Sequence, residues 1–242
     1  MHSNVAIIIP SRLGSTRLDK KPLKQIGSQS MISHVLDQVK LTKLQNIYVA
    51  TDSDLIAEKV AEKNCKSIMT DPNCSSGTDR VFDAFQLIPN KAEIEYIINV
   101  QGDMPFVEPE AILAVIENLK NSSFQIMTPV AKVNKEVADF NSNVKVVVNN
   151  TGKALYFSRN LIPFGANEFL YHIGIYGFRK KTLAEFVQLP QSPLEKYENL
   201  EQLRAMENNI DIGVCYVDNI PISVDTQEDL NKAIAFYNSL PV

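Results

Sequence analysis

Four cations gather in one short segment of a chain whose net charge is -4. The segment IIIPSRLGSTRLDKKPL (7–23) places Arg12, Arg17, Lys20 and Lys21 after an apolar run, with one glycine and two hydroxyl side chains between the arginines. Guanidinium and ammonium groups complement phosphate oxygens, so this segment suits a triphosphate. It matches neither GxxxxGK[ST] nor GxGxxG. On local grounds alone, a solvated surface loop is an equally good interpretation.

Two carboxylates follow later apolar runs. Asp103 lies in NVQGDMP (99–105), where Gly102 permits a tight turn, and Asp225 lies in VDT (224–226). Each has a plain local alternative, because an aspartate after a strand is often a turn residue or a helix N-cap. If both reach one face, they could hold Mg²⁺ against phosphate oxygens. Cations for a triphosphate and acids for its metal are what a nucleotidyltransferase requires.

The elements that position these residues follow an alternating pattern up to about residue 130. Short β-branched runs predict strands at 5–9, 46–51, 67–69 and 95–103. Amphipathic stretches predict helices at 31–42, 53–64, 77–88 and 108–120. Alternation of this kind predicts the α/β class, with an open, mostly parallel, Rossmann-like sheet flanked by helices. Ligands of such sheets bind beyond the carboxyl ends of the strands, where the basic segment and Asp103 lie.

The pattern changes beyond residue 130. Strands are predicted without intervening helices at 145–149, 154–158 and 171–179, which indicates a smaller antiparallel β insertion. Helices are then predicted near 181–188 and 194–208, and strand-like runs at 213–217 and 221–225. A last helix begins after Thr226, with Asp229 at its third position.

Composition narrows the class of protein. A chain of 242 residues suits one domain, and its acidic balance argues against a general nucleic-acid-binding protein. Cys65, Cys74 and Cys215 form no CxxC pair, so neither a zinc site nor a disulfide framework is expected. No apolar run is long enough for a signal peptide or a membrane span, so we expect a cytoplasmic protein without a membrane partner.

Longer motifs make the chain resemble the 3-deoxy-manno-octulosonate cytidylyltransferases, the CMP-Kdo synthetases of lipopolysaccharide biosynthesis. The resemblance covers nearly the full length. The motifs that carry it are IIIPSRLGSTRLDKKPL, ATDSD (50–54), SSGTDR (75–80), NVQGDMP, NVKVVVN (143–149), ALYFSR (154–159), HIGIYGF (172–178), SPLEKYENLEQLR (192–204) and VDTQEDL (224–230). It implies a nucleotide-diphospho-sugar transferase type of fold in a single domain, 1–242, with an insertion at about 132–180 for dimerisation or the sugar.

The resemblance also implies site residues. Arg12, Ser15, Arg17 and Lys21 would cradle the CTP phosphates, with Lys21 and Arg17 counted with Asp103 and Asp225 as catalytic. Nucleotide contacts would also come from Pro10, Ser11, Ser76, Gly77 and Arg80. Asp103 and Asp225 would hold Mg²⁺. The sugar acid would be bound by Gln101, Arg159, His172, Tyr176, Glu201 and Gln202.

Some of these residues have plain alternatives when they are taken alone. His172, in an apolar run, is typical of a hydrogen-bonded core histidine, and Tyr176 could simply pack. Glu201 and Gln202 would be typical of a solvated helix face, and Cys74 is interpreted as structural or incidental.

Several positions depart from the family pattern, among them the family's GKPMI, which is Ser28 to Ile32 here. RLPGKPL becomes Arg17 to Leu23 with Asp19 and Lys20, the HQSGT segment has Cys74 and Ser75, and VQGDEP has Met104. We expect a loop that is more mobile or differently shaped, and the exact sugar acid stays open. The alternatives are a cytidylyltransferase for 8-amino-Kdo or sialic acid, another nucleotidyltransferase, or a non-catalytic nucleotide-binding relative. An inverting glycosyltransferase is disfavoured, because it usually has DxD where this chain has Asp-Met-Pro.

The reaction implied by the resemblance is Mg²⁺-dependent transfer from CTP to 3-deoxy-D-manno-octulosonate (Kdo), giving CMP-Kdo and pyrophosphate. The small-molecule partners would be CTP and Kdo, and the family implies a homodimer.

Overall fold

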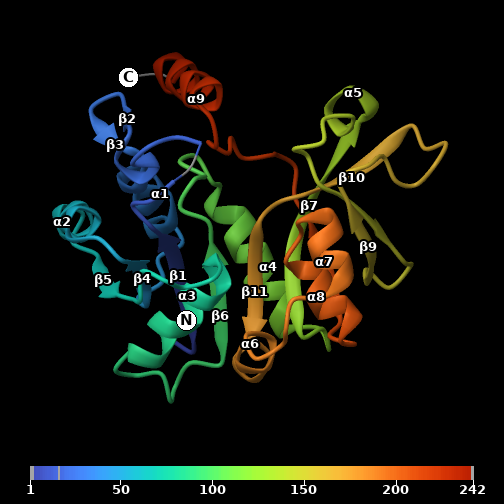
Figure 1. The fold of residues 1–242 in the computed structure, drawn as a ribbon, viewed down its shortest axis with the longest axis horizontal. Helices are drawn as coiled ribbons and strands as arrows, with labels where there is room; N and C mark the ends of the chain where they lie inside the picture. The colour runs from blue at the N-terminus through green and yellow to red at the C-terminus, as the bar shows by residue number, and fades with distance from the viewer. Residues whose placement is uncertain (1–2, 16, 241–242) are drawn as a thin grey trace. The chain divides into compact units, whose positions relative to one another are not determined.

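The computed structural model describes residues 3–15 and 17–240 (Figure 1). The chain forms two compact units, one made of Met1–Ile112 with Pro221–Val242 and the other of Leu113–Ile220. In the described part of the chain, no helix is long and apolar enough to cross a membrane.

The first unit contains four parallel strands. β1 (Val5–Ser11), β4 (Ile47–Thr51), β5 (Lys66–Met69) and β6 (Tyr96–Val100) lie in the order β5-β4-β1-β6. The apolar residues that begin β1 are fully buried, as expected for a central parallel strand. The predicted strands and their parallel arrangement are confirmed.

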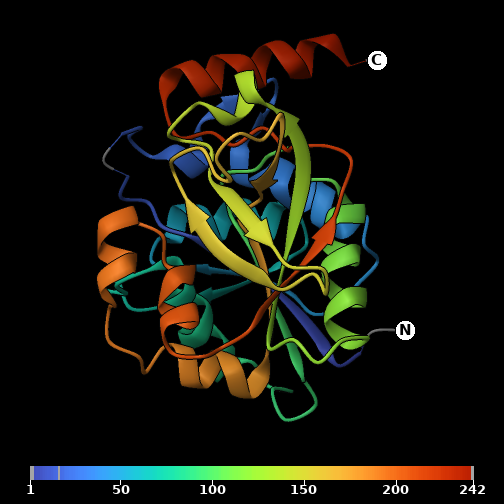
Figure 2. The ribbon, with the colours of Figure 1, turned by 90° about the vertical axis from the view of Figure 1, so that its right-hand side faces the viewer.

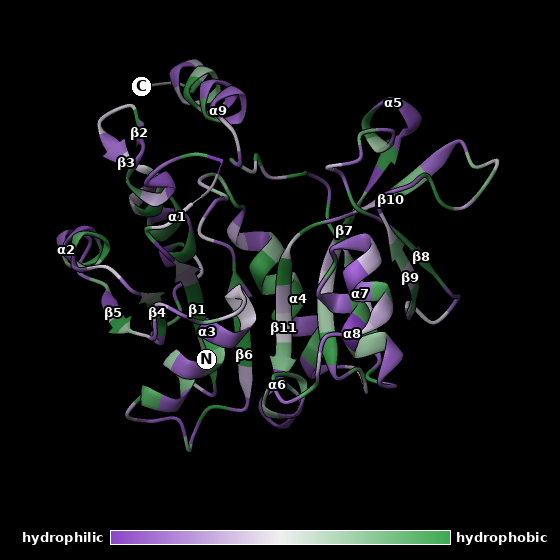
Figure 3. Cartoon of the chain, viewed as in Figure 1, coloured by the Kyte–Doolittle hydropathy of each residue, from purple (hydrophilic) through white to green (hydrophobic). Residues whose placement is uncertain are grey.

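Four helices alternate with these strands as predicted, and the predicted last helix, α9, also belongs to this unit. They are α1 (Met31–Lys40), α2 (Asp54–Glu62), α3 (Gly77–Leu87), α4 (Pro109–Lys120) and α9 (Gln227–Ser239). The Thr226 and Asp229 side chains form the predicted capping box at the start of α9. Figure 3 shows α9 carrying both hydrophobic and hydrophilic residues, as expected of a helix with one packed face.

Short elements follow the basic segment. A 3₁₀ turn, η1 (Lys21–Leu23), leads to β2 (Gln25–Ile26) and β3 (Gln29–Ser30), which pair antiparallel in a two-stranded sheet. Lys20 precedes η1 in the left-handed conformation, with φ 50°.

The second unit is largely antiparallel. Its strands are β7 (Ile126–Asn134), β8 (Lys145–Val148), β9 (Ala154–Ser158), β10 (Glu168–His172), β11 (Ile175–Arg179) and β12 (Ile212–Tyr216), and several of them run through the yellow part of Figure 2. The order is β11-β7-β10-β8-β9, and β12 pairs with β7 in parallel. The predicted antiparallel pairing is confirmed, whereas β7 and the short helix α5 (Lys135–Ala138) carried no prediction.

One predicted strand, 171–179, is two strands. β10 pairs with residues 130–134 of β7, and β11 pairs with residues 126–127. Between them, the Thr128 hydroxyl donates to the carbonyls of Ile173 and Ile175 at 3.1 and 2.8 Å. The Ile175 amide also donates to the Ile173 carbonyl at 2.7 Å, so a tight turn, bonded to the Thr128 hydroxyl, divides the segment.

Two other predictions are wrong in detail. The helix predicted at 194–208 is α7 (Pro193–Glu198) and α8 (Gln202–Glu207), separated where Asn199 adopts φ 52°. Left-handed backbone ends a helix. The run 221–225 is not a strand, although Val224 donates a backbone hydrogen bond to Asp103. The helix predicted at 181–188 is α6 (Lys180–Phe186).

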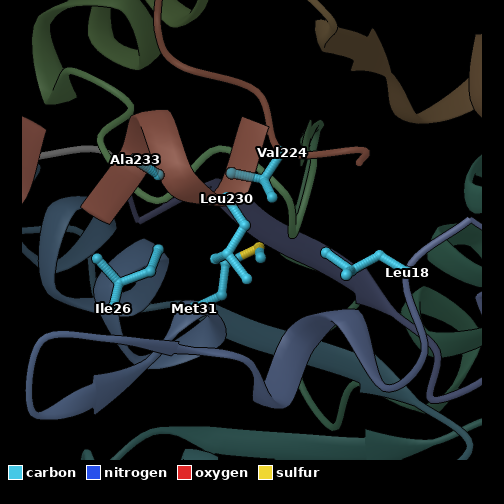
Figure 4. Close-up of a cluster of buried hydrophobic side chains, with 6 residues drawn as sticks. All are labelled: Leu18, Ile26, Met31, Val224, Leu230 and Ala233. Atoms are coloured by element: carbon cyan, nitrogen blue, oxygen red, sulfur yellow. The ribbon is translucent and has the colours of Figure 1, made fainter. Parts of the chain in front are cut away.

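One apolar cluster of the first unit joins two distant parts of the chain, 18–31 and 224–233 (Figure 4). Its buried residues are Leu18, Ile26, Met31, Val224, Leu230 and Ala233. Leu18 follows Arg17 in the basic segment, and Val224 precedes Asp225. Burial of Leu18 and Val224 therefore fixes the backbone beside two predicted site residues, Arg17 and Asp225.

Candidate active site

A pocket of about 310 Å³ lies in the first unit, where β1 and β6 end. It is lined by every predicted site residue of that unit, namely Pro10, Ser11, Arg12, Ser15, Arg17, Lys21, Ser76, Gly77, Arg80, Gln101, Asp103 and Asp225. Gly14, Pro22, Cys74, Ser75 and Gly102 also line it. The strand ends, the basic segment and the start of α3 thus meet at one site, as expected for this type of sheet.

Lys21 lies between the two acids. Its Nζ is 2.8 Å from Asp103 Oδ2 and 2.9 Å from Asp225 Oδ1. Burial lowers the pKa of Lys21, but the charges and hydrogen bonds of Asp103 and Asp225 outweigh it, so the pKa is raised overall. The side chain is therefore a protonated ammonium at neutral pH.

Asp225 is held by a second cation. Arg17 contacts its other carboxylate oxygen, with a nitrogen-to-oxygen distance of 3.2 Å. Leu18 and Val224, the neighbours of these two residues, share the cluster of Figure 4. Packing behind the pocket thus brings the basic segment and the chain before α9 together.

The backbone brings the two acids together as well. The amide of Val224 donates to the carbonyl of Asp103 at 2.9 Å. Gly102 allows the end of β6 to approach β1, because a Cβ at this position would lie 3.0 Å from the carbonyl oxygen of Pro10. Glycine is required here for this close approach rather than for an unusual turn.

The two carboxylates fit a magnesium ion. Each directs one oxygen at the same point. The Lys21 ammonium occupies this point, where a metal cation would lie. Among the described residues there is no group of three or more His, Cys, Asp or Glu that could hold a metal. A pair of carboxylates suits Mg²⁺, which proteins often bind through one or two carboxylates with phosphate oxygens and water as the other ligands.

Arg80, Ser76 and Gln101 also line the pocket, Arg80 being buried and the other two half-buried. Arg80, 2% exposed, donates to Thr70 Oγ1 at 2.6 Å and to Asp52 Oδ2 at 3.2 Å. Ser76 caps α3 by accepting a hydrogen bond from the Asp79 amide. Gln101 donates to the Asn99 side chain at 3.1 Å.

The departures from the family pattern have different positions. Cys74 and Ser75 line the pocket, whereas Met104 is buried at 3% exposure. Asp19 and Lys20 are exposed. Burial and the hydrogen bond that the Cys74 thiol donates to Asp83 raise the pKa of Cys74 to about 11, so the thiol is protonated at neutral pH.

The remaining predicted residues lie in the second unit. The side chain of Arg159, after β9, donates to the backbone carbonyls of Asn141, Glu198 and Asn199 at 3.1, 2.8 and 3.2 Å. Its backbone amide donates to the Glu198 carboxylate at 3.0 Å. These bonds fasten the end of β9 to α7.

His172 and Tyr176 lie in an aromatic group of the second unit. The His172 ring lies 5.3 Å from that of Tyr176 and 5.1 Å from that of Phe157. Burial lowers the pKa of His172 to about 3, and its Nε2 lies 3.0 Å from Thr128 Oγ1. His172 is thus a neutral, hydrogen-bonded histidine, as its local alternative describes. Burial, and then Glu201, raise the pKa of Tyr176 well above 10.

Gln202 contradicts its local alternative. It is 6% exposed rather than part of a solvated face, and its Nε2 has no hydrogen-bond partner among the residues that the structure describes. Glu201 lies 3.7 Å from Arg204. Buried amides are normally paired, so the Gln202 nitrogen is suited to a polar ligand or a water.

Asp52 is the contact that the sequence prediction missed. It accepts hydrogen bonds from two sides of the pocket, although no site role was predicted for it from the sequence. The available signal was its place after a strand that neighbours β1, because Asp103 follows β6 in the same way.

Comparison with known proteins shows the family of the chain. The cytidylyltransferase family model matches residues 6–212. A protein of Rickettsia bellii (strain OSU 85-389) named 3-deoxy-manno-octulosonate cytidylyltransferase is 59% identical over 236 residues, which covers 98% of this chain and 97% of the relative. One of the same name from Rickettsia canadensis (strain McKiel) is 58% identical over 239 residues, or 99% of this chain and 98% of the relative.

A solved structure gives the same result. It is CMP:2-keto-3-deoxy-manno-octonic acid synthetase complexed with CTP, which matches with a TM-score of 0.91 and 35% identity over 98% of this chain and 99% of that one. The chain therefore belongs to the cytidylyltransferase family, and within it to the 3-deoxy-manno-octulosonate cytidylyltransferases.

Proposed function

We propose that this protein transfers the cytidylyl group of CTP to Kdo in a Mg²⁺-dependent reaction that activates the sugar acid for lipopolysaccharide synthesis. Family membership supports the donor and the acceptor. The observation that carries the proposal for this chain is the convergence of Asp103 and Asp225 on one cation position in a pocket lined by Arg12, Arg17 and Lys21.

The reaction is an in-line displacement at the α-phosphorus of CTP. The anomeric 2-hydroxyl oxygen of Kdo forms the new P–O bond, its proton is lost to solvent, and the bond to the β-phosphate oxygen breaks to release pyrophosphate. Displacements of this kind depend mainly on positioning and charge neutralisation. The chain therefore needs no covalent nucleophile, and the protonated thiol of Cys74 is not assigned such a role.

The residues of the first unit divide the work. Arg12, Ser15, Arg17 and Lys21 bind and orient the phosphates, and Lys21 and Arg17 stabilise the charge that develops on the leaving pyrophosphate. Asp103 and Asp225 would hold Mg²⁺, which, when bound, supplies positive charge to the phosphate oxygens. Pro10, Ser11, Ser76, Gly77 and Arg80 contact the nucleotide.

The sugar acid and the assembly complete the proposal. Kdo is bound by Gln101, Arg159, His172, Tyr176, Glu201 and Gln202. The buried Gln202 amide suits this role, because its nitrogen has no hydrogen-bond partner within 3–15 and 17–240. We further propose a cytoplasmic homodimer of a single nucleotidyltransferase domain, with the region at about 132–180 serving dimerisation and the sugar site. Nucleic acid and membrane are not partners in this proposal.

Pyrophosphate release tests the function. The protein is incubated with Mg²⁺, CTP and Kdo, beside reactions with UTP or ATP, with sialic acid or 8-amino-Kdo, and with EDTA. We expect release only with CTP and Kdo and only with the metal. Release with another sugar acid would keep the chemistry and move the specificity. Binding of CTP without release in any mixture would contradict the proposal and favour a non-catalytic relative.

A further inference from the structure

Asp52, directly after β4, joins two sides of the nucleotide pocket. One carboxylate oxygen, Oδ1, accepts a hydrogen bond from the backbone amide of Leu13 at 3.1 Å. The other, Oδ2, accepts one from the Arg80 guanidinium at 3.2 Å. The Asp52 side chain is only 13% exposed, so the two bonds are sheltered from water.

Both partners of Asp52 position pocket residues. Leu13 lies between Arg12 and Gly14, two residues of the basic segment that line the pocket. Arg80 lines the pocket from α3. Asp52 contacts both without being a lining residue itself, so it can fix their separation.

The contact with Arg80 also sets the orientation of the guanidinium. Thr70 Oγ1 accepts from one terminal nitrogen at 2.6 Å, and Asp52 accepts from the other. Because a guanidinium is planar and carries five N–H donors, two fixed acceptors determine the plane in which the other donors lie. Arg80 is 2% exposed, so this orientation is built in before a ligand arrives.

We propose that Asp52 is a positioning residue for CTP binding. Its carboxylate holds the phosphate-binding backbone at Leu13 and the Arg80 guanidinium in fixed positions relative to each other. The inference rests on the proposed function, because the ligand is the nucleotide of that reaction. It assigns Asp52 no contact with CTP.

The sign of the binding change separates positioning from charge. A carboxylate near a triphosphate site repels the ligand, so charge alone predicts that neutral variants bind CTP more tightly. Positioning predicts weaker binding, because the ligand must then order the loop and the guanidinium itself. A merely structural ion pair predicts lower stability with an unchanged CTP dissociation constant.

Three variants separate the effect of the Leu13 contact from that of the Arg80 contact. Asp52→Asn keeps an acceptor for the Leu13 amide but loses the charge facing Arg80, whereas Asp52→Ala loses both contacts. Thr70→Val removes the second acceptor of Arg80, and with it the hydrogen bond that the Thr70 hydroxyl donates to the Thr51 carbonyl at 3.2 Å, but keeps both contacts of Asp52. Asp37→Asn is the matched control, because it breaks the Asp37–Lys63 ion pair (2.6 Å) outside the pocket lining.

The test combines two measurements on the full chain. Calorimetric titration with CTP gives the dissociation constant, and hydrogen exchange by NMR reports protection of the Leu13 amide without nucleotide. We expect Asp52→Ala to bind CTP on the order of tenfold more weakly, the loss typical of a charge-assisted hydrogen bond. Asp52→Asn and Thr70→Val should lie between it and the wild type, with the Asp37→Asn value unchanged.

Exchange of the Leu13 amide should be faster in Asp52→Ala and unchanged in Thr70→Val. Equal or tighter CTP binding by both Asp52 variants would overturn the inference, as would Leu13 protection that is independent of Asp52. A wild-type protein that does not bind CTP would instead contradict the proposed function. In that case, the exchange result alone would decide whether Asp52 anchors the loop.

Discussion

The ammonium of Lys21 lies 2.8 Å from the carboxylate of Asp103, just beyond the carboxyl end of β6. The same nitrogen lies 2.9 Å from Asp225, so one ammonium contacts both acids, and Arg17 supplies a second positive charge at Asp225. A divalent ion bound by the two carboxylates would compete with this ammonium. Lys21 would then be released toward the phosphates that the metal accompanies.

Removing the Lys21 charge should therefore strengthen metal binding in the absence of nucleotide. We expect Lys21→Met to bind Mn²⁺, a spectroscopic substitute for Mg²⁺, on the order of tenfold more tightly, because a unit charge a few ångströms away is worth more than about 1 kcal/mol. Titration followed by electron paramagnetic resonance measures the affinity. Lys24→Met, which removes the same charge three residues along, is the control. Equal Mn²⁺ affinity in Lys21→Met and the wild type would show that the ammonium does not compete.

Gly102 should not tolerate a methyl group. In Gly102→Ala the new Cβ would lie 3.0 Å from the Pro10 carbonyl oxygen, and β1 or β6 would have to shift. We expect a loss of about 1–3 kcal/mol in the free energy of unfolding, the usual cost of overpacking, measured by urea denaturation. Gly14→Ala is the control, because nothing lies within 4 Å of its added Cβ. Similar unfolding midpoints for the two variants would contradict the close approach.

Lys20 adopts the backbone conformation that favours the glycine of the family pattern. Its φ is 50°, a left-handed value that costs an L-residue about 1 kcal/mol or more. Lys20→Gly should therefore raise the melting temperature by a few degrees, after the entropy of glycine in the unfolded chain is subtracted. Lys24→Gly, at a residue with φ -61°, should lower it. A lower melting temperature for Lys20→Gly would contradict the left-handed assignment.

His172 should make stability depend on pH. Burial lowers its pKa from 6.5 to about 3, so between these values the unfolded chain binds a proton that the folded chain does not. Stability is then fully present above pH 6.5 and is lost as the pH falls. The loss from this residue should be about 2 kcal/mol between pH 6.5 and pH 5. Urea denaturation of the wild type and His172→Gln at both pH values measures the difference, and parallel changes in the two proteins would contradict it.

The alternating half of the fold was predictable because each element is determined by its own residues. The apolar run that begins β1 and the amphipathic pattern of α1 need no distant partner to be identified. The end of β6 then predicted that Asp103 meets the basic segment, whereas Asp225 lies beside Lys21 although the strand predicted before it is absent. The role of Asp52 was not predicted, because it depends on a contact with Leu13, 39 residues away in the sequence.

The second unit was harder to predict for physical reasons. β7 contains Pro129, a residue type that usually argues against a central strand, and here Pro129 lies between the stretches paired with β11 and β10. The division of 171–179 lies at a tight turn between Ile173 and Ile175, whose carbonyls accept hydrogen bonds from Thr128 of another strand. Asn199 interrupts the predicted helix at 194–208 by adopting a left-handed backbone conformation, which the neighbouring residues in the sequence do not indicate.

Pyrophosphate release by Asp103→Asn, with CTP, Kdo and Mg²⁺, tests the central claim most directly. The substitution keeps the size of the side chain but removes one of the two charges that would hold the metal, so turnover should fall on the order of 10³-fold. Circular dichroism should show the wild-type fold, and excess Mg²⁺ should not restore the rate. Near-normal turnover with the wild-type dependence on Mg²⁺ would contradict the assignment of Asp103 to the metal.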